Sequence, residues 1–268
     1  MGKIRRIERV AALTKELVDH PYELYSFTDF CKRYDVAKST LSEDVQAIRN
    51  GLAAYDLGIV ETLAGAAGGV RFIPCHTKVS DEEFLKALAV RMAEPERILP
   101  GSMIYMNDLL LTPKLLLRLG EIIMSRNKGH VPEYVMTVET KGIPLALFVA
   151  RAYNVPLVMA RRESRITEGS AVSINYVSGS TKRIQAMSLP KRALPAEARV
   201  LIVDDFMKAG GTAKGLRDLA LEVGAEVVGT GFLVATREPE HKMVDDYFSL
   251  FVLHGVDDAA RTIDIRPN

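Results

Sequence analysis

Two adjacent carboxylates followed by a glycine-rich loop are the part of this sequence best suited to bind a small charged molecule. Asp204 and Asp205 follow the apolar run Val200–Val203, and the loop Lys208–Thr212, with the sequence KAGGT, comes next. A short apolar run rich in β-branched residues is typical of a strand buried in a parallel sheet. Ligands of open α/β sheets bind at the carboxyl ends of such strands. The acidic pair is therefore predicted to end a strand and to face a ligand.

The loop adds a predicted phosphate site, because a helical pattern follows it from Lys214 to Val223. The first backbone N–H groups of a helix and the N–H groups of a glycine-rich loop attract phosphate. One ligand that offers a phosphate to the loop and hydroxyl groups or a metal to the carboxylates is a sugar phosphate. A lone Gly-Gly pair would usually be a surface turn, but the order of strand, acidic pair, basic residue and loop favours a binding site.

This order resembles the signature of the type I phosphoribosyltransferases, whose ligand is 5-phosphoribosyl 1-pyrophosphate (PRPP). The resemblance implies that the acidic pair holds the ribose 2′ and 3′ hydroxyls and that the loop binds the 5′-phosphate. The residues it assigns to PRPP here are Asp204, Asp205, Phe206, Met207, Lys208, Ala209, Gly210, Gly211 and Thr212. Ala209 departs from the many members that carry Thr or Ser at its position, and the charge of Lys208 can compensate for the lost hydroxyl donor.

The same resemblance assigns two further segments. Thr140, Lys141 and Gly142 follow the predicted strand Val135–Val138, where the family places its pyrophosphate loop. Arg161 and Arg162 follow the next strand, where basic residues of the family often reach PRPP bound by the partner subunit. An ordinary solvated pair is an equally good interpretation of the two arginines.

The segment Glu168–Lys182 is rich in Ser, Gly and Thr and stands where the family carries a mobile loop that closes over PRPP. Tyr176 and Lys182 are its candidate contacts, with a long hairpin as the alternative interpretation. Tyr105 is a further candidate, since it and Phe206 offer the rings available for stacking on a base.

The first 76 residues have a pattern of their own. Apolar residues recur at helical spacing up to Pro21, and a short helix after Ser26 and a third helix from about Lys38 follow. Thr40 and Glu43 match a capping box. Leu41, Val45 and Ile48 form the predicted inward face of the third helix. Two apolar arms, Gly58–Leu63 and Val70–Pro74, then form a predicted hairpin with a glycine-rich tip.

Three helices followed by a hairpin predict a winged-helix domain. Its third helix carries short polar and long basic side chains, as a helix that reads DNA requires, although Glu43 and Asp44 count against this. The predicted DNA contacts are Lys3, Arg5, Arg6, Lys38, Ser39, Thr40, Ser42, Gln46, Arg49 and Arg71. A basic N-terminal arm can also be an ordinary solvated start, and such a unit can also bind proteins.

The rest of the chain alternates strands and helices, which predicts an α/β domain with a mostly parallel sheet. We expect a winged-helix domain over residues 1–76, a hinge at Thr77–Asp81 and a phosphoribosyltransferase-like domain over residues 77–268, with the last strand near Tyr247–Leu253. The net charge of +1 gives no global basic field, so a DNA site must be a local patch. Without a signal peptide or membrane-spanning run, the expected compartment is the cytoplasm.

The combination of both domains closely resembles the purine operon repressors of Gram-positive bacteria over essentially the whole chain. The segments that carry this resemblance are Lys38–Ser39, Ser42–Asp44, Gly65–Val70, Pro95–Gly101, Thr140–Ala146, Thr167–Ser170, Tyr176–Ser180 and Asp204–Thr212. The resemblance implies a homodimer that binds operator DNA at purine genes and loses DNA affinity when PRPP binds. PRPP then acts as a signal and not as a substrate, so no catalytic residue and no catalytic cofactor is expected.

Two other functions stay open on the sequence. A purine-salvage phosphoribosyltransferase would use the same PRPP signature, although it needs no winged-helix domain. A PRPP-responsive scaffold that binds proteins would need no DNA. Mg²⁺ is expected to accompany PRPP, but the sequence contains no evident metal site of its own, and a purine nucleotide that competes with PRPP stays open.

Overall fold

The computed structural model describes residues 4–65, 68–162, 169–177 and 183–268 of the chain. Its residues group into two compact units. The first unit comprises residues 1–77 with 152–154, and the second comprises residues 78–151 with 155–268. Lys3 and Lys182, two of the predicted ligand contacts, lie outside the described residues.

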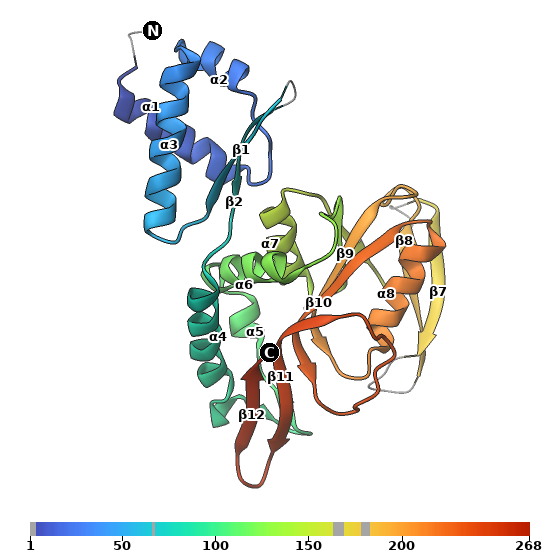
Figure 1. The fold of residues 1–268 in the computed structure, drawn as a ribbon. Helices are drawn as coiled ribbons and strands as arrows, with labels where there is room; N and C mark the ends of the chain where they lie inside the picture. Colours follow the sequence, from blue (N-terminus) through green and yellow to red (C-terminus); the bar gives the residue numbers. More distant parts are fainter. Residues whose placement is uncertain (1–3, 66–67, 163–168, 178–182) are drawn as a thin grey trace. The chain divides into compact units, whose positions relative to one another are not determined.

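The first unit contains three helices and a hairpin (Figure 1). These elements are α1 (Arg6–Asp19), α2 (Phe27–Tyr34), α3 (Lys38–Ala54), β1 (Ile59–Leu63) and β2 (Gly69–Ile73). The strands pair antiparallel with Val60 opposite Phe72. Their inner side chains join Leu13, Phe30 and Leu41 in one core, because the apolar stripe of each helix must be buried against a neighbour. This order agrees with the predicted winged helix.

The third helix starts where it was predicted, but its predicted capping box is wrong. The helix begins at Lys38 after Ala37, so Thr40 lies inside the first turn and forms no capping box with Glu43. Asp44, one of the two acids that counted against a DNA-reading helix, is fully buried and so lies off the exposed face. Its carboxylate accepts hydrogen bonds from Arg9 at 2.5 Å and from Arg6 at 3.1 Å. These ion pairs fix α1 against α3.

The second unit is built on a six-stranded sheet with the order β12-β11-β10-β9-β5-β6. Five neighbouring strands are parallel, and β12 pairs antiparallel with β11. The strands are β5 (Tyr134–Val138), β6 (Leu157–Ala160), β9 (Arg199–Met207), β10 (Glu226–Thr236), β11 (Phe248–Asp257) and β12 (Thr262–Pro267). This arrangement confirms the predicted α/β class with a mostly parallel sheet.

Helices and two small hairpins surround this sheet. They are α4 (Lys78–Met92), β3 (Ile98–Leu99), β4 (Met103–Ile104), α5 (Asn107–Leu110), α6 (Pro113–Arg126), α7 (Ile143–Tyr153), β7 (Ala171–Val177), β8 (Ile184–Pro190) and α8 (Gly211–Glu222), with a short 3-10 turn at Pro95–Arg97. The hairpin β7–β8 and α8 bury the face of the sheet that carries Val138 and Ile202. Leu201 and Val203, on the opposite face, are also fully buried, as expected for parallel strands covered on both sides.

Three boundaries in this unit were predicted wrongly. Strand β9 does not end at Val203 but continues through the acidic pair to Met207, because β10 still pairs with it up to Ala235 opposite Met207. Residues 78–81 of the predicted hinge form the first turn of α4. The strand predicted near Tyr247–Leu253 extends to Asp257, and β12 after it was not predicted.

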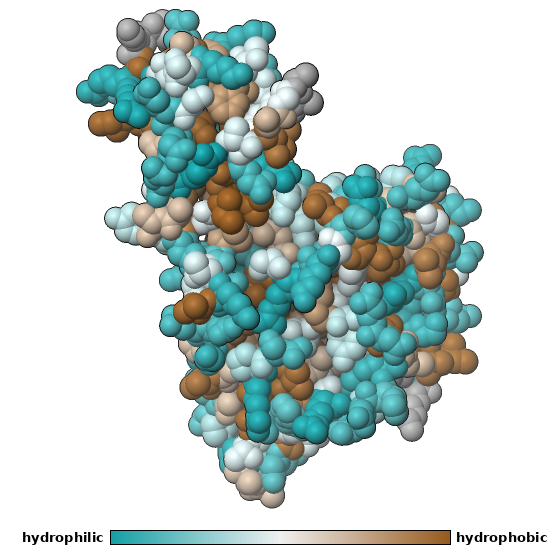
Figure 2. Space-filling model, viewed as in Figure 1, coloured by the Kyte–Doolittle hydropathy of each residue, from teal (hydrophilic) through white to brown (hydrophobic). Residues whose placement is uncertain are grey.

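Hydrophilic and hydrophobic residues alternate over the visible surface in small areas, without one continuous apolar band (Figure 2). Within the part of the chain that the structure describes, none of the helices has the length and apolar character needed to span a bilayer.

The buried Asp44 gives a stability prediction. Asp44→Asn leaves the buried Arg9 guanidinium without its anion, and breaking a buried ion pair costs about 3–5 kcal/mol. We expect urea denaturation to show a loss of about 3 kcal/mol for the first unit. The matched control is Asp19→Asn, which changes an exposed i,i+4 ion pair between Lys15 and Asp19 within α1. This variant should lose far less stability. Equal losses in the two variants would contradict the structural role of Asp44.

Candidate functional site

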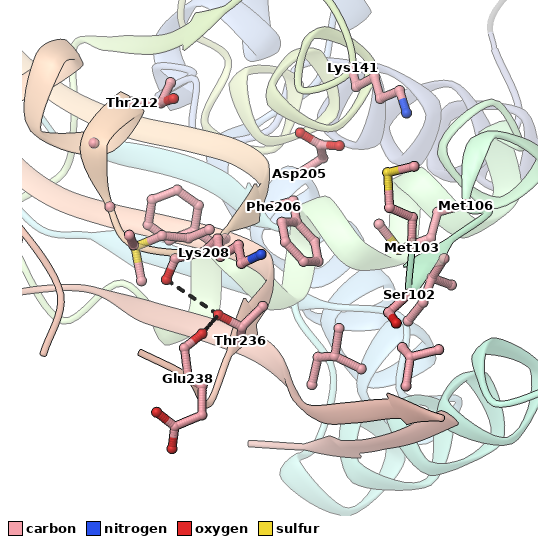
Figure 3. Close-up of a pocket in the computed structure, with 18 of the residues that line it drawn as sticks. Ser102, Met103, Met106, Lys141, Asp205, Phe206, Lys208, Thr212, Thr236 and Glu238 are labelled. Carbon is pink, nitrogen blue, oxygen red and sulfur yellow. Dashed lines mark hydrogen bonds between the residues drawn. The ribbon is translucent and has the colours of Figure 1, made fainter. Parts of the chain in front are cut away.

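A cavity of about 620 Å³ opens in the second unit at the carboxyl end of β9 (Figure 3). Its lining comes from the turn after β5, Arg162 after β6, the stretch from Asp205 to Ala213, and three residues on or just after β10, Phe232, Thr236 and Glu238. Residues 101–104 with Met106, and residues 253–256, complete it. Of the residues that the sequence assigned to a ligand, the cavity brings together Lys141, Arg162, Asp205, Phe206, Met207, Lys208, Ala209, Gly210, Gly211 and Thr212. The predicted phosphate loop, Asp205 of the acidic pair and Lys141 of the predicted pyrophosphate turn therefore face one space, whereas Asp204, Thr140 and Gly142 are not part of the lining.

The space exists because β9 pairs with its two neighbouring strands over different lengths. Strand β9 pairs with β5 only as far as Met136 opposite Ile202, whereas its pairing with β10 continues beyond Asp204. The acidic pair thus lies on a strand that has lost its neighbour on one side. The chain leaves β5 after Val138 and forms the turn that contains Lys141. A gap between two strand ends at the point where they diverge is the usual ligand position in open α/β sheets.

Asp204 lies beneath the cavity wall and is only 6 % exposed. One of its carboxylate oxygens accepts a hydrogen bond from the Asp205 backbone N–H at 3.0 Å. Burial raises the pKa of Asp204 well above its ordinary value, and the nearby Asp205 charge adds to this effect, while the positive charge of Arg162 opposes it. Burial also raises the pKa of Asp205, against the lowering effects of its hydrogen bond with Asp204 and of Lys141.

Gly142 explains how the turn after β5 can approach this carboxylate. A Cβ atom at position 142 would lie 2.0 Å from Asp204 Oδ1 and 2.6 Å from Thr137 Oγ1, so no side chain fits there. Thr140, Lys141 and Gly142 therefore form a turn that packs its backbone directly on the acidic pair. The Lys141 side chain extends along the cavity wall near Asp205 (Figure 3).

The phosphate loop closes onto the start of α8. Gly210 has a φ of 83°, a left-handed conformation that favours glycine, and its carbonyl accepts the first helical hydrogen bond from Lys214 at 2.8 Å. The helix begins at Gly211, so the N–H groups of its first residues have no partner within the helix. Thr212 and the exposed Lys208 also line the cavity. This is the arrangement that binds phosphate at a helix N-terminus.

The far wall of the cavity was not predicted. Its apolar side chains are Met103, Ile104, Met106, Leu253 and Val256, and Phe206 projects into the space between this wall and the phosphate loop (Figure 3). The hydrogen bond from the Ser102 hydroxyl to Asp258, at 3.3 Å, joins the two segments of the wall. No local motif marks these residues, because they are brought together from positions about 150 residues apart.

Three predicted contacts lie elsewhere. Tyr176 is buried in the core between β7 and α8, where its ring would meet a Cβ at Gly215 and its hydroxyl donates to Gln185 at 2.8 Å. Its burial does not support a role as a lid contact. Arg161 pairs with Glu139 at 3.4 Å, and Tyr105 is 44 % exposed outside the cavity lining. Arg162, expected to reach a partner's ligand, lines the cavity of its own chain.

The first unit presents the predicted DNA-binding residues of α3 on its surface. Lys38, Ser39, Ser42 and Gln46 are exposed, and Thr40 and Arg49 are partly exposed. Arg49 is also a structural link, because it donates to the Val60 carbonyl at 2.9 Å and to the Thr62 hydroxyl at 2.6 Å on strand β1. It further donates to the Gln46 side chain at 2.7 Å. The hairpin is thereby fixed to the exposed face of α3.

The remaining basic residues of the predicted interface have partners within the unit. Arg71 pairs with Glu61 at 2.8 Å across the hairpin, and Arg5 pairs with Glu8 at 2.6 Å. Arg6 begins α1 and contacts Asp44, so Arg5 and Arg6 lie at the start of a helix and not on an extended arm. Lys38 lies at the leading end of α3 with its ammonium 6.0 Å from the centre of the Phe27 ring.

The fold and the cavity define a protein of the phosphoribosyltransferase fold with an added helical domain. Residues 107–264 match the phosphoribosyl transferase domain, and residues 5–74 match the N-terminal domain of the bacterial purine repressor. Adenine phosphoribosyltransferase from Saccharomyces cerevisiae shares the fold with a TM-score of 0.54 and 18% identity, over 62% of this chain and 97% of that structure.

Similarity over nearly the full length is found with transcriptional regulators. The purine biosynthesis transcriptional repressor PurR of Bacillus subtilis is 45% identical over 98% of this chain and 93% of its own length. The purine biosynthesis transcriptional activator PurR of Lactococcus lactis subsp. lactis is 39% identical over 98% of this chain and 97% of its own length. The chain belongs to the PurR family of purine biosynthesis regulators.

The buried carboxylate gives a pH prediction. Because burial raises the pKa of Asp204, the folded chain keeps a proton on this group at pH values where the unfolded chain has released it. The ionised form therefore lowers stability above the folded-state pKa, and this cost disappears as the pH falls towards the ordinary aspartate pKa of about 3.9. Asp204→Asn should raise the melting temperature at pH 8 by about 2–4 °C, the shift that about 1 kcal/mol gives a domain of this size.

The gain in melting temperature of Asp204→Asn should be smaller at pH 5 than at pH 8. Asp218→Asn, which changes an exposed pair with Lys214 on α8, is the control and should give no such pH-dependent gain. A melting temperature that falls at pH 8 in Asp204→Asn would show that the ionised carboxylate is stabilising in the empty cavity.

Proposed function

We propose that this protein represses purine biosynthesis genes by binding operator DNA through its first unit, and that PRPP bound in the cavity weakens this binding. The observation that carries the proposal is one cavity lined by Asp205, by the phosphate loop and by the cationic side chains of Lys141, Arg162 and Lys208, with Asp204 buried behind its wall. The first unit of the same chain has the three helices and hairpin of a winged-helix domain. Such a regulator acts in the cytoplasm. The higher identity to the relative named a repressor than to the one named an activator favours repression.

In this proposal each part of PRPP meets a matching group. The ribose hydroxyls donate to the carboxylates of Asp204 and Asp205, which replaces some of the solvation these buried groups have lost. The 5′-phosphate accepts hydrogen bonds from the loop Lys208–Thr212, and the pyrophosphate lies near Lys141 and Arg162. Phosphate groups bound to N–H donors and to cations in a partly enclosed site make charge-assisted hydrogen bonds, which are stronger than neutral ones.

Mg²⁺ is proposed to enter with the pyrophosphate. Asp205 brings carboxylate oxygens, the ligand type that Mg²⁺ prefers, to the cavity wall near Lys141 (Figure 3). Among the described residues there is no group of three or more side chains suited to hold a metal. When bound, the ion would neutralise part of the pyrophosphate charge, while the residues of this chain bind the ribose and the 5′-phosphate.

The coupling between PRPP and DNA must be reciprocal. If PRPP lowers operator affinity by some factor, operator DNA lowers PRPP affinity by the same factor. We propose a homodimer as the DNA-binding form, since dimers bind paired half-sites on DNA. A purine nucleotide is proposed as a competitor of PRPP, because its phosphates suit the loop and its flat base suits the apolar wall beside Phe206 and Met103.

A purine-salvage phosphoribosyltransferase is the second candidate. The observation that favours it is the apolar wall of the cavity, which could receive a base beside the projecting ring of Phe206. The similarity to an adenine phosphoribosyltransferase leaves about two fifths of this chain unmatched, whereas the regulators match nearly all of it. Incubation of the protein with PRPP, Mg²⁺ and guanine, xanthine, hypoxanthine or adenine tests this candidate, and release of a nucleotide would support it.

A gel shift with DNA from upstream of a purine biosynthesis operon tests the main proposal. At one fixed salt concentration we expect specific binding that PRPP weakens, because affinity for DNA depends strongly on salt. The double variant Asp204→Ala, Asp205→Ala should bind the same DNA with unchanged affinity and lose the response to PRPP. Release of this variant by PRPP at the wild-type concentration would show that the acidic pair is not part of the effector site.

The DNA-binding face gives a separate prediction. Lys38→Ala removes an exposed charge at the leading end of α3, so operator affinity should fall about tenfold and the slope of affinity against salt should decrease by about 1. PRPP affinity should not change. Lys32→Ala, which removes an exposed charge from α2, is the matched control. Equal effects of both variants would remove α3 as the specific DNA-binding helix.

A further inference from the structure

The segment between β10 and β11, residues 237–247, contacts both the phosphate loop and α8, where Arg217 donates to the Asp246 carbonyl at 3.1 Å. The ammonium group of Lys242 donates to the Lys208 carbonyl at 2.6 Å, and the Met243 backbone N–H donates to the Ala209 carbonyl at 2.9 Å. A Cβ atom at Gly210 would lie 3.2 Å from the Met243 nitrogen, so the two backbones are in direct contact. Two successive carbonyl groups of the loop are thus held by this segment.

These two hydrogen bonds determine where the loop N–H groups point. In a planar trans peptide, the carbonyl and the N–H of the next residue point in opposite directions. The Lys208 carbonyl therefore orients the Ala209 N–H, and the Ala209 carbonyl orients the Gly210 N–H, away from residues 242 and 243. Lys208, Ala209 and Gly210 line the cavity, whereas Lys242 and Met243 are not part of its lining. Reversal of either peptide would present a carbonyl oxygen, with its partial negative charge, to a bound phosphate.

Thr236 keeps Lys242 in place. The Thr236 hydroxyl accepts from the Lys242 ammonium at 3.2 Å, and it donates to the Glu238 carbonyl at 2.5 Å and, in a longer contact of 3.3 Å, to the Lys208 carbonyl. Figure 3 shows Thr236 between Lys208 and Glu238, at the edge of the cavity. Lys242 is partly buried in this contact, whereas Lys208 on the loop itself is exposed. The cation that orients the loop is therefore a different residue from the one that the sequence assigned to the phosphate.

We propose that Lys242 is a positioning residue for the 5′-phosphate subsite: its ammonium group holds the Lys208 carbonyl away from the cavity, so that the loop presents N–H groups to the phosphate. This inference rests on the proposed function, in which the loop binds the 5′-phosphate of PRPP. Lys242 has no contact with the turn at Lys141, where the pyrophosphate would lie. Its effect is therefore confined to ligands that carry the 5′-phosphate.

Isothermal titration of the full-length chain with three ligands tests this. The ligands are PRPP, ribose 5-phosphate and inorganic pyrophosphate, each with Mg²⁺. In Lys242→Met we expect the affinity for PRPP and for ribose 5-phosphate to fall about tenfold, the effect of losing one hydrogen bond to a charged group. Pyrophosphate affinity should stay unchanged. Lys242→Arg, which keeps the charge and the donors, should restore most of the loss.

Lys214→Met is the matched control, because it also removes a cation close to the loop. The Lys214 ammonium group pairs with Asp218 and does not bond to a loop carbonyl. Equal losses in Lys214→Met and Lys242→Met would overturn the proposal in favour of general charge attraction. The proposal would also be overturned if Lys242→Met lost as much affinity for pyrophosphate as for PRPP, or if it lost no affinity for ribose 5-phosphate. If the wild-type chain binds ribose 5-phosphate but Lys242→Met binds it equally well, only this inference fails. If the wild-type chain binds none of the three ligands, the proposed function fails with it.

Discussion

The contact between Gly142 and the buried Asp204 carboxylate is the constraint on which the rest of the cavity depends. It brings the turn after β5 against the carboxyl end of β9, at the place where the two strands stop pairing. A larger residue at position 142 would separate the groups proposed to hold the ribose from those proposed to hold the pyrophosphate. Burial raises the pKa of this carboxyl group, and a strongly shifted acid beside a cavity is a common sign of a functional site.

The sequence was sufficient to predict the signature strand, the acidic pair and the phosphate loop, because all three are local patterns within 13 consecutive residues. It also predicted the winged helix, since helical spacing and a glycine-rich hairpin are local too. It could not predict that β9 runs on to Met207, because the length of a strand depends on pairing with β10. It could not predict that Asp44 is buried for a similar reason, since its partners Arg6 and Arg9 lie on another helix.

The apolar wall of the cavity and the contact of Lys242 with the phosphate loop could not be predicted either, because both depend on contacts between distant segments. Residues 101–106 and 253–256 have no motif, and their side chains meet only after the whole second unit has folded. Lys242 resembled any other charged residue of a polar loop, and its importance is visible only from the 2.6 Å contact with the Lys208 carbonyl. Tyr176 shows the opposite error, because an aromatic residue beside a glycine-rich segment suggested a ligand contact and is part of the core.

The division of the cavity between distant segments has an evolutionary consequence. The groups proposed to recognise PRPP come from the segments that follow β5 and β6, from β9 and from the loop that leads into α8. The apolar wall opposite them comes from Met103, Ile104 and Met106 and from the end of β11. Substitutions in the wall can therefore change whether a second substrate fits without altering the phosphate loop or the acidic pair. An ancestral transferase could in this way become a metabolite sensor through a few changes at one side of the cavity, and the opposite transition would be equally accessible.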